Sequence, residues 1–84
     1  MQCKYEVEVR AQCPVNPQDT DLYIFTIESE SIIECEKITA FIAENAGKKE
    51  VFQETLTNLC AVTLGAKVTS VGWHGGIKVT CQAP

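Results

Sequence analysis

Cys13 is the residue of this chain whose side chain could most readily do covalent chemistry. It stands directly before Pro14, after a stretch in which apolar and charged residues alternate. The thiolate is the reactive form of cysteine, so an active Cys13 would need a neighbour that lowers its pKa or receives its proton. On the residues alone, two readings stay open. Cys13 can be a nucleophile, or a small apolar residue that completes the inward face of a strand and enters the extended turn that proline imposes.

Five further titratable side chains could take part in such chemistry, and each also has an ordinary structural explanation. Asp19 and Asp21 fall in a stretch rich in proline, asparagine and aspartate, which is turn chemistry. Glu34 and Glu54 fall at the expected starts of two helices, where an acid opposes the positive end of the helix dipole. His74 is the single histidine and follows Gly72-Trp73, so a metal site of several histidines is excluded and a surface position is the simplest expectation.

The composition restricts the class of protein. The five cysteines are odd in number and at least ten residues apart, so neither a disulfide framework nor a C-x-x-C metal clip is indicated, and we expect reduced thiols in a cytoplasmic protein. No signal peptide or membrane span is expected. The net charge is -4 and the seven Lys and Arg residues are scattered, which argues against a nucleic-acid partner. An apolar fraction of 45% in 84 residues predicts one domain, residues 1–84, that gains from self-association.

The elements that must position these side chains follow from the periodicity of the sequence. Strict alternation predicts strands, and a period of three to four apolar residues predicts helices that glycines end. The order is β-β-α-α-β-β, an α+β fold in which two helices cover one face of a four-stranded antiparallel sheet. The predicted strands are 3–11, 22–28, 67–73 and 76–82, the loop is 12–21, the helices run from about 35 to 46 and from about 49 to 64, and His74-Gly75 forms the last turn.

This connectivity decides which candidate residues can meet. The loop after the first strand, the helix-helix turn and the last hairpin turn all lie at one end of the sheet, whereas Glu34 lies at the other. A site that uses both Cys13 and Glu34 would therefore be assembled from two subunits. Residues 22–27 place apolar groups on both faces of their strand, so the outer face is expected to be covered by another element or another subunit.

The chain resembles the 7-cyano-7-deazaguanine reductases of queuosine synthesis and their archaeal amidinotransferase relatives. These proteins have the tunnelling fold and assemble into oligomeric barrels. The resemblance covers roughly residues 9 to 80 in the family's order. Four short pieces carry it: Cys13-Pro14 before an Asp-bearing loop, Ile33-Glu34, Phe52-Gln53-Glu54, and the hairpin from Gly72 to Ile77.

The resemblance implies roles for these residues toward a 7-deazaguanine or pterin-like ring. Cys13 would attack a nitrile carbon to form a thioimide, and Asp21 or Asp19 would transfer protons. Carboxylates accept hydrogen bonds from the N–H edge of a guanine-like ring, so the glutamates would anchor the base. The implied substrate-binding residues are Glu34, Gln53, Glu54 and His74.

The chain also departs from the family. Gln53 stands where the family has a proton-exchanging histidine, and glutamine cannot exchange protons near neutral pH. Glu36 and His74 replace cations that help to bind NADPH, which argues against NADPH-dependent reduction, and we expect no cofactor. Two hypotheses remain: a cysteine-dependent enzyme of nitrile or amidine chemistry, and a non-catalytic oligomeric binding or scaffold protein of the same fold.

Overall fold

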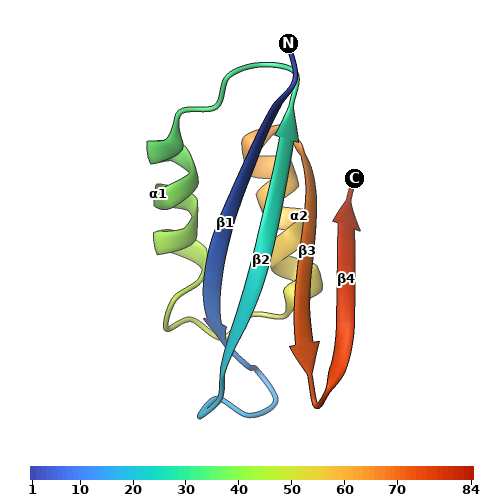
Figure 1. Ribbon diagram of the computed structural model, residues 1–84. Coiled ribbons are helices and arrows are strands. Elements are labelled where there is room, and N and C mark those ends of the chain that lie inside the picture. Colours follow the sequence, from blue (N-terminus) through green and yellow to red (C-terminus); the bar gives the residue numbers. More distant parts are fainter.

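The computed structural model describes all residues, 1–84, and has the predicted order of elements. Its four strands form one antiparallel sheet in the order β1-β2-β3-β4, and α2 contacts β2, β3 and β4 from one side while α1 stands beside β1 (Figure 1). The elements are β1 (Cys3–Gln12), β2 (Thr20–Ser29), α1 (Cys35–Asn45), α2 (Gln53–Leu64), β3 (Lys67–His74) and β4 (Ile77–Ala83).

The register of the sheet sets which side chains face the helices. Val9 lies opposite Tyr23, and Tyr23 lies opposite Gly72, so these three positions share the inward face. The last hairpin closes with a two-residue loop, Gly75-Gly76, whose φ angles are 57° and 82°. Positive φ at both central positions is the type I′ geometry that matches the twist of paired strands. The turn is thus Gly75-Gly76, one residue later than the predicted turn His74-Gly75, and His74 is the last residue of β3.

The core lies between the sheet and the helices. α1 contributes Ile38 and Phe41, and α2 contributes Leu56 and Cys60, all at most 5% exposed. The inward face of the sheet contributes these buried apolar side chains: Val9, Ala11, Tyr23, Phe25, Ile27, Val68 and Ala83.

The second helix differs from the prediction in its start and in the face that it buries. α2 begins at Gln53, not at residue 49, because Glu50 forms an isolated parallel bridge with Gln12 at the end of β1. Gln12 donates to the Lys49 carbonyl at 3.1 Å and accepts from the Val51 amide at 3.2 Å. The sequence predicts an apolar face of Phe52, Leu56, Leu59, Cys60 and Thr63 for this helix, and the structure confirms Leu56 and Cys60 as buried. Phe52, Leu59 and Thr63 are exposed, whereas Gln53, Thr57 and Ala61 are buried, so the helix is rotated from the predicted face.

The two ends of the sheet separate the candidate residues as the connectivity predicted. Glu34 is the N-cap residue of α1 and lies at the end where β2 leaves the sheet, whereas Cys13 follows the last residue of β1 at the other end. The outer face of the sheet is not covered by any element of this chain. Leu22, Ile24 and Trp73 are 45%, 38% and 58% exposed, and Lys78 Nζ lies 5.7 Å from the centre of the Trp73 ring.

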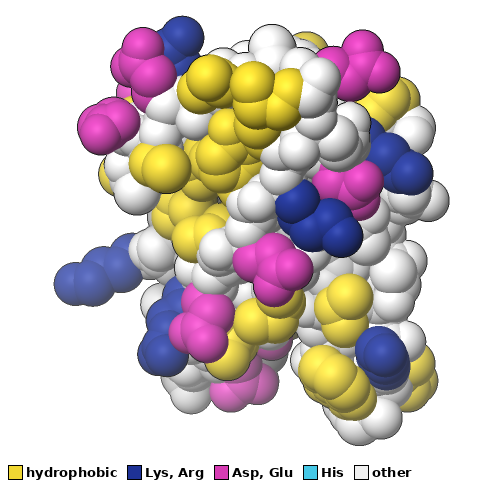
Figure 2. Space-filling view, turned by 45° about the horizontal axis from the view of Figure 1, so that its top comes forward, with side chains coloured by type: hydrophobic (Ala, Val, Ile, Leu, Met, Phe, Trp, Pro, Cys, Tyr) yellow, Lys and Arg dark blue, Asp and Glu magenta, His cyan; other side chains and the backbone are white.

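Charged side chains are dispersed over the surface. On the face that Figure 2 shows, Lys and Arg side chains stand apart from one another and among acidic ones, and apolar atoms are exposed between them. Neither α1 nor α2, of 11 and 12 residues, has the length and hydrophobicity that a membrane crossing needs.

Candidate functional site

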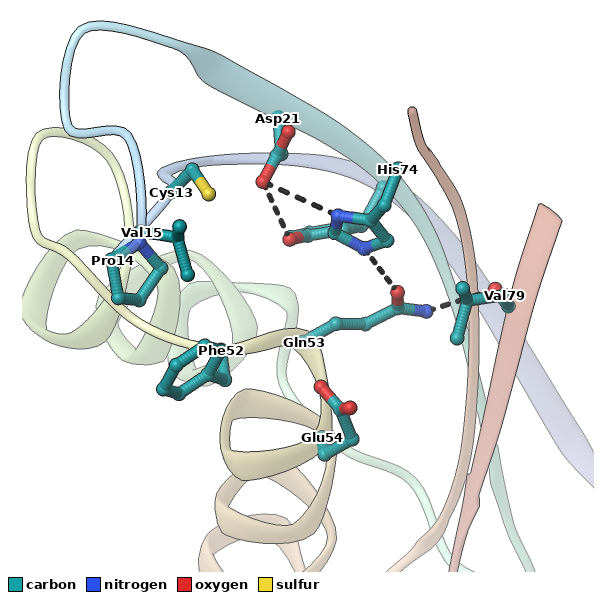
Figure 3. A pocket seen from close by; sticks show the side chains of 10 residues that line it. Cys13, Pro14, Val15, Asp21, Phe52, Gln53, Glu54, His74 and Val79 are labelled. Carbon is teal, nitrogen blue, oxygen red and sulfur yellow. Dashed lines mark hydrogen bonds and ion pairs between the residues drawn. The ribbon is translucent and has the colours of Figure 1, made fainter. Parts of the chain in front are cut away.

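A pocket of about 400 Å³ opens at the end of the sheet where β1 ends, β2 begins, β3 ends and α2 starts. Figure 3 shows its wall divided by chemistry. One side carries the thiol and apolar groups, and the other carries carboxylate, imidazole and amide groups. The lining residues are Cys13, Pro14, Val15, Asp21, Tyr23, Phe52, Gln53, Glu54, His74 and Val79.

Main-chain hydrogen bonds bring the thiol to the start of α2. Gln12 is held on one side by its pairing with Thr20 in β2 and on the other by the bridge to Glu50. Cys13 continues from that fixed residue and donates its amide to the Asp19 carbonyl at 3.1 Å. Its thiol is free and half-buried. Phe52, which follows the bridge and caps α2, is therefore carried to the same rim as Cys13.

Asp21 is the hydrogen-bond acceptor in a small cluster of polar side chains in the pocket. The Tyr23 hydroxyl donates to Asp21 Oδ2 at 3.1 Å, and His74 Nδ1 lies 3.7 Å from the same oxygen. Burial raises the pKa of Tyr23, and the Asp21 charge raises it further, so this phenol stays a hydrogen-bond donor at every physiological pH. The Tyr23 ring lies against Gly72, where an added Cβ would come within 2.4 Å of Tyr23 Cδ1.

Gln53 is buried at 1% exposure although it stands at the first turn of a helix. Its amide nitrogen lies 3.1 Å from the Val79 carbonyl and 3.3 Å and 3.0 Å from the carbonyl and hydroxyl oxygens of Ser70. Its amide oxygen lies 2.9 Å from His74 Nε2. The amide is thus fully engaged by the protein, and it reaches a ligand only through His74.

Two buried hydroxyls complete this network. The Thr57 hydroxyl donates to the main-chain carbonyl of Gln53 at 2.7 Å. The Thr57 oxygen is then left to accept from the Ser70 hydroxyl at 2.6 Å. The Ser70 oxygen in turn accepts from the Gln53 amide. No buried side-chain nitrogen or oxygen in the chain is left without a partner. A closed circuit of polar groups inside an apolar core is costly to bury unless every member is satisfied, and here every member is.

The carboxylate of Glu54 lies beside the polar wall, in the first turn of α2 and close below Gln53 in Figure 3. Its charge reaches the neighbouring strand: the pKa of the Cys81 thiol is raised by burial first and by Glu54 second, although a Ser70 hydrogen bond acts in the opposite direction. The pocket thus offers one free carboxylate edge facing an apolar wall made by Phe52, Val15 and Pro14.

The structure brings together most of the residues that the sequence singled out. Cys13, Asp21, Gln53, Glu54 and His74 all line the pocket. Two of the predicted residues lie outside it. Asp19 is exposed and accepts from Asn16 Nδ2 at 2.9 Å, and Glu34 is exposed with no side-chain capping bond.

Sequence reasoning missed Tyr23 as a site residue. The signal was present in the alternation of β2, because Tyr23 follows Asp21 by two residues and must share its face. Reasoning from the residues alone also expected His74 to be a surface residue. Its side chain is 35% exposed, and its ring also lines the pocket, 5.7 Å from the ring of Tyr23, centre to centre.

Comparisons with known proteins identify the fold. No protein-family model matches the sequence, and no curated protein matches it. The β-β-α-α-β-β chain, with a four-stranded antiparallel sheet and two helices, has the tunnelling fold. A solved structure that shares it is archaeosine synthase QueF-Like in the apo form, with a TM-score of 0.80 and 16% sequence identity over 98% of this chain and 90% of that one. At this identity the likeness concerns the fold.

Proposed function

We propose that the pocket binds a planar, nitrogen-rich heterocycle of the 7-deazaguanine or pterin class and that Cys13 adds to an electrophilic nitrile carbon on it. The observation that carries the proposal is the convergence of a free thiol, two carboxylates and an imidazole on one cavity of about 400 Å³. That volume suits a single small ring system. The structural neighbour is named an archaeosine synthase, which supports a substrate of this kind.

Recognition would use both walls of the pocket. The Glu54 carboxylate would accept hydrogen bonds from the N–H edge of the ring, and charge-assisted bonds of this type are stronger than neutral ones. The exposed ring of Phe52, at 53% exposure, would provide an apolar surface on which a flat heterocycle can stack. Burial of Phe52 by a ligand would remove one of the larger exposed apolar groups of the chain.

The chemistry would be addition followed by displacement. The Cys13 sulfur forms a bond to the nitrile carbon, one carbon–nitrogen π bond opens, and the nitrogen takes up the proton that the thiol gave, so the thioimide forms without any oxidant or reductant. Asp21, which lines the pocket, would take part in that proton transfer. An amine that attacks the thioimide carbon would then expel the thiolate and leave an amidine. Ammonia or a primary amine is the co-reactant that this second step requires.

The residues present do not suit a nicotinamide dinucleotide as a further reactant. The first turn of α1 presents the exposed acids Glu34 and Glu36, which repel phosphate groups. His74 is held by Gln53 inside the pocket and does not offer a cation at the hairpin tip. The proposed reaction therefore contains no hydride transfer.

A homo-oligomer would complete the site. Glu34 cannot reach the pocket of its own chain because it lies at the opposite end of the sheet. A neighbouring subunit that packs against the uncovered outer face or the free strand edges could place its Glu34 beside Cys13 and supply the second carboxylate anchor. A particle that is strictly monomeric in solution, measured by light scattering, would remove Glu34 from the site.

The decisive experiment records the intact mass of the protein after incubation with 7-cyano-7-deazaguanine. We expect an adduct of one ligand that is absent from Cys13→Ala and retained in Cys35→Ala, which removes an exposed thiol outside the pocket. An adduct that persists in Cys13→Ala would refute the nucleophile. Saturable binding without an adduct would establish the alternative, a non-catalytic binding protein, and no binding would refute both ring-specific versions.

A further inference from the structure

The orientation of the Gln53 amide follows from its partners. An amide nitrogen only donates and an amide oxygen only accepts. The nitrogen end of Gln53 faces two main-chain carbonyl oxygens, those of Ser70 and Val79, which only accept. The reversed amide would place its oxygen against both carbonyls and lose two hydrogen bonds in a buried site. The oxygen of Gln53 must therefore face His74.

This orientation fixes the hydrogen on the imidazole. The Gln53 oxygen, 2.9 Å from His74 Nε2, can only accept, so Nε2 carries a hydrogen and donates it. In the neutral ring the other nitrogen, Nδ1, then has a free lone pair. Nδ1 lies 3.7 Å from Asp21 Oδ2, which on its own would favour the opposite arrangement, with the hydrogen on Nδ1. Gln53 and Asp21 thus compete for the tautomer of His74, and the shorter contact belongs to Gln53.

We propose that Gln53 is a positioning residue that holds His74 in the Nε2–H tautomer, and that His74 Nδ1 is the atom that carries protons in the pocket. Gln53 cannot exchange protons itself, but it determines which imidazole nitrogen can. The proton-carrying side chain thus belongs to His74, at the end of β3, and not to Gln53, at the start of α2. The carrier role rests on the proposed function, whereas the tautomer does not.

The buried circuit beneath Gln53 supports a positioning role. Gln53, Thr57 and Ser70 are 1%, 1% and 0% exposed, and apolar side chains of similar size could fill the same space without any polar group to satisfy. The circuit meets a side chain of the polar pocket wall through the bond from His74 to the Gln53 oxygen. A network of this kind specifies a single geometry, and the geometry that it specifies here is that of the imidazole.

The proton balance of thioimide formation can pass through this atom. Nδ1 accepts the proton of the Cys13 thiol, the sulfur bonds to the nitrile carbon, and the resulting imidazolium gives the same proton to the nitrile nitrogen as its π bond opens. During the step the imidazolium is stabilised on both sides: Nδ1–H faces the Asp21 carboxylate and Nε2–H stays bound to Gln53. The Tyr23 hydroxyl keeps Asp21 in place, and the Glu54 carboxylate adds negative charge at the same wall.

The first test needs no ligand. Because the chain has one histidine, a nitrogen-15 NMR spectrum of its imidazole reports a single ring. At a pH where imidazoles are neutral, we expect the Nε2–H tautomer in the wild type. In Gln53→Met, Asp21 has no competitor, and we expect the tautomer ratio to move toward Nδ1–H by about fivefold or more, the ratio that one ordinary hydrogen bond of about 1 kcal/mol supports.

Matched variants separate positioning from general loss of buried polarity. Ser70→Ala removes a hydroxyl from the same circuit but leaves the Val79 and Ser70 carbonyls that orient the amide, so the tautomer should not change. Gln53→Leu removes the same acceptor with a different apolar side chain and should shift the tautomer in the same direction as Gln53→Met. An Nδ1–H tautomer in the folded wild type would overturn the inference even if Gln53→Met does not fold.

The second test measures the rate of adduct formation with 7-cyano-7-deazaguanine. We expect Gln53→Met and His74→Asn each to slow it by about 100-fold or more, the usual contribution of a positioned acid–base group. An unchanged rate in either variant would overturn the carrier role. If no adduct forms even in the wild type, the proposed function fails, while the tautomer measured in the absence of ligand still stands or falls by itself.

Discussion

Replacement of Gly72 by alanine should destabilise the fold through one side chain, the ring of Tyr23. Gly72 has no need of glycine's conformational freedom, because its φ is not positive. It is required because a Cβ there would come within 2.4 Å of Tyr23 Cδ1 and 2.8 Å of Tyr23 Cε1. Atoms of a folded protein do not approach this closely, so either the ring or the strand must move.

The size of the effect follows from how tightly the ring is held. Tyr23 is 1% exposed, and its ring stands edge-on to Phe25 with the ring centres 6.4 Å apart, so a displacement of the ring disturbs both this contact and the bond to Asp21. Overpacking of a filled core costs about 1–3 kcal/mol in the free energy of unfolding. A displaced ring would also weaken the bond from the Tyr23 hydroxyl to Asp21, so we expect a loss of about 2–4 kcal/mol. For a domain of this size that corresponds to a fall in Tm of about 8–30 °C.

Thermal and urea unfolding followed by circular dichroism would measure the loss. Gly76→Ala is the matched control, since it adds the same methyl group at a position with open space and should cost only the strain of its positive φ, about 1–2 kcal/mol. In a Tyr23→Leu background, where the ring is absent, Gly72→Ala should cost less than about 0.5 kcal/mol. An equal cost of Gly72→Ala in both backgrounds would show that the ring contact is not the cause.

Three further expectations follow from the same structure. Burial raises the pKa of the Cys60 thiol from 9.0 to about 11, so folding favours the neutral thiol. The stabilising contribution of the neutral Cys60 thiol is complete below about pH 9 and is lost as the pH rises toward 11. The free energy of unfolding should therefore fall less steeply over this pH range in Cys60→Ala than in the wild type. Glu54→Gln should weaken binding of the heterocycle by about tenfold or more in calorimetry, because a charge-assisted hydrogen bond becomes a neutral one; an unchanged affinity would remove Glu54 from the ring-binding wall. Leu22→Glu should lower the mass of the particle in light scattering and shift the Trp73 fluorescence to longer wavelength, while the Tm of the monomer stays unchanged. An unchanged mass would show that the outer face is not an interface.

Local patterns in the sequence were sufficient to predict the fold class. Apolar patterns and turn residues located all four strands to within two residues at each end, and Gly65 ends α2 in the left-handed conformation, with a φ of 62°. Connectivity alone placed Glu34 away from Cys13. These features depend on neighbours in the chain, which a sequence displays directly.

The features that the sequence did not reveal depend on contacts between distant segments. The start of α2 is set by the bridge between Gln12 and Glu50, and no local signal announces a pairing across 38 positions. In β3 the polar Ser70 and His74 face inward while Trp73 faces outward, which is the reverse of the usual arrangement. The reason lies in Gln53, whose buried amide requires polar partners on the inward face. A histidine beside two glycines therefore resembled a surface residue until the partner beneath it was placed.

The double anchoring of Gln12 has a consequence for how this protein can diversify. Since Gln12 is paired with Thr20 on one side and with the segment before α2 on the other, the main chain delivers Cys13 to the pocket from a point that the residues between 14 and 18 do not control. That short stretch, which includes Pro14 and Val15 of the pocket wall, could change in length or composition while the thiol stays near its place. We therefore expect that exchange of this loop changes the wall of the pocket while the Cys13 thiol keeps its position.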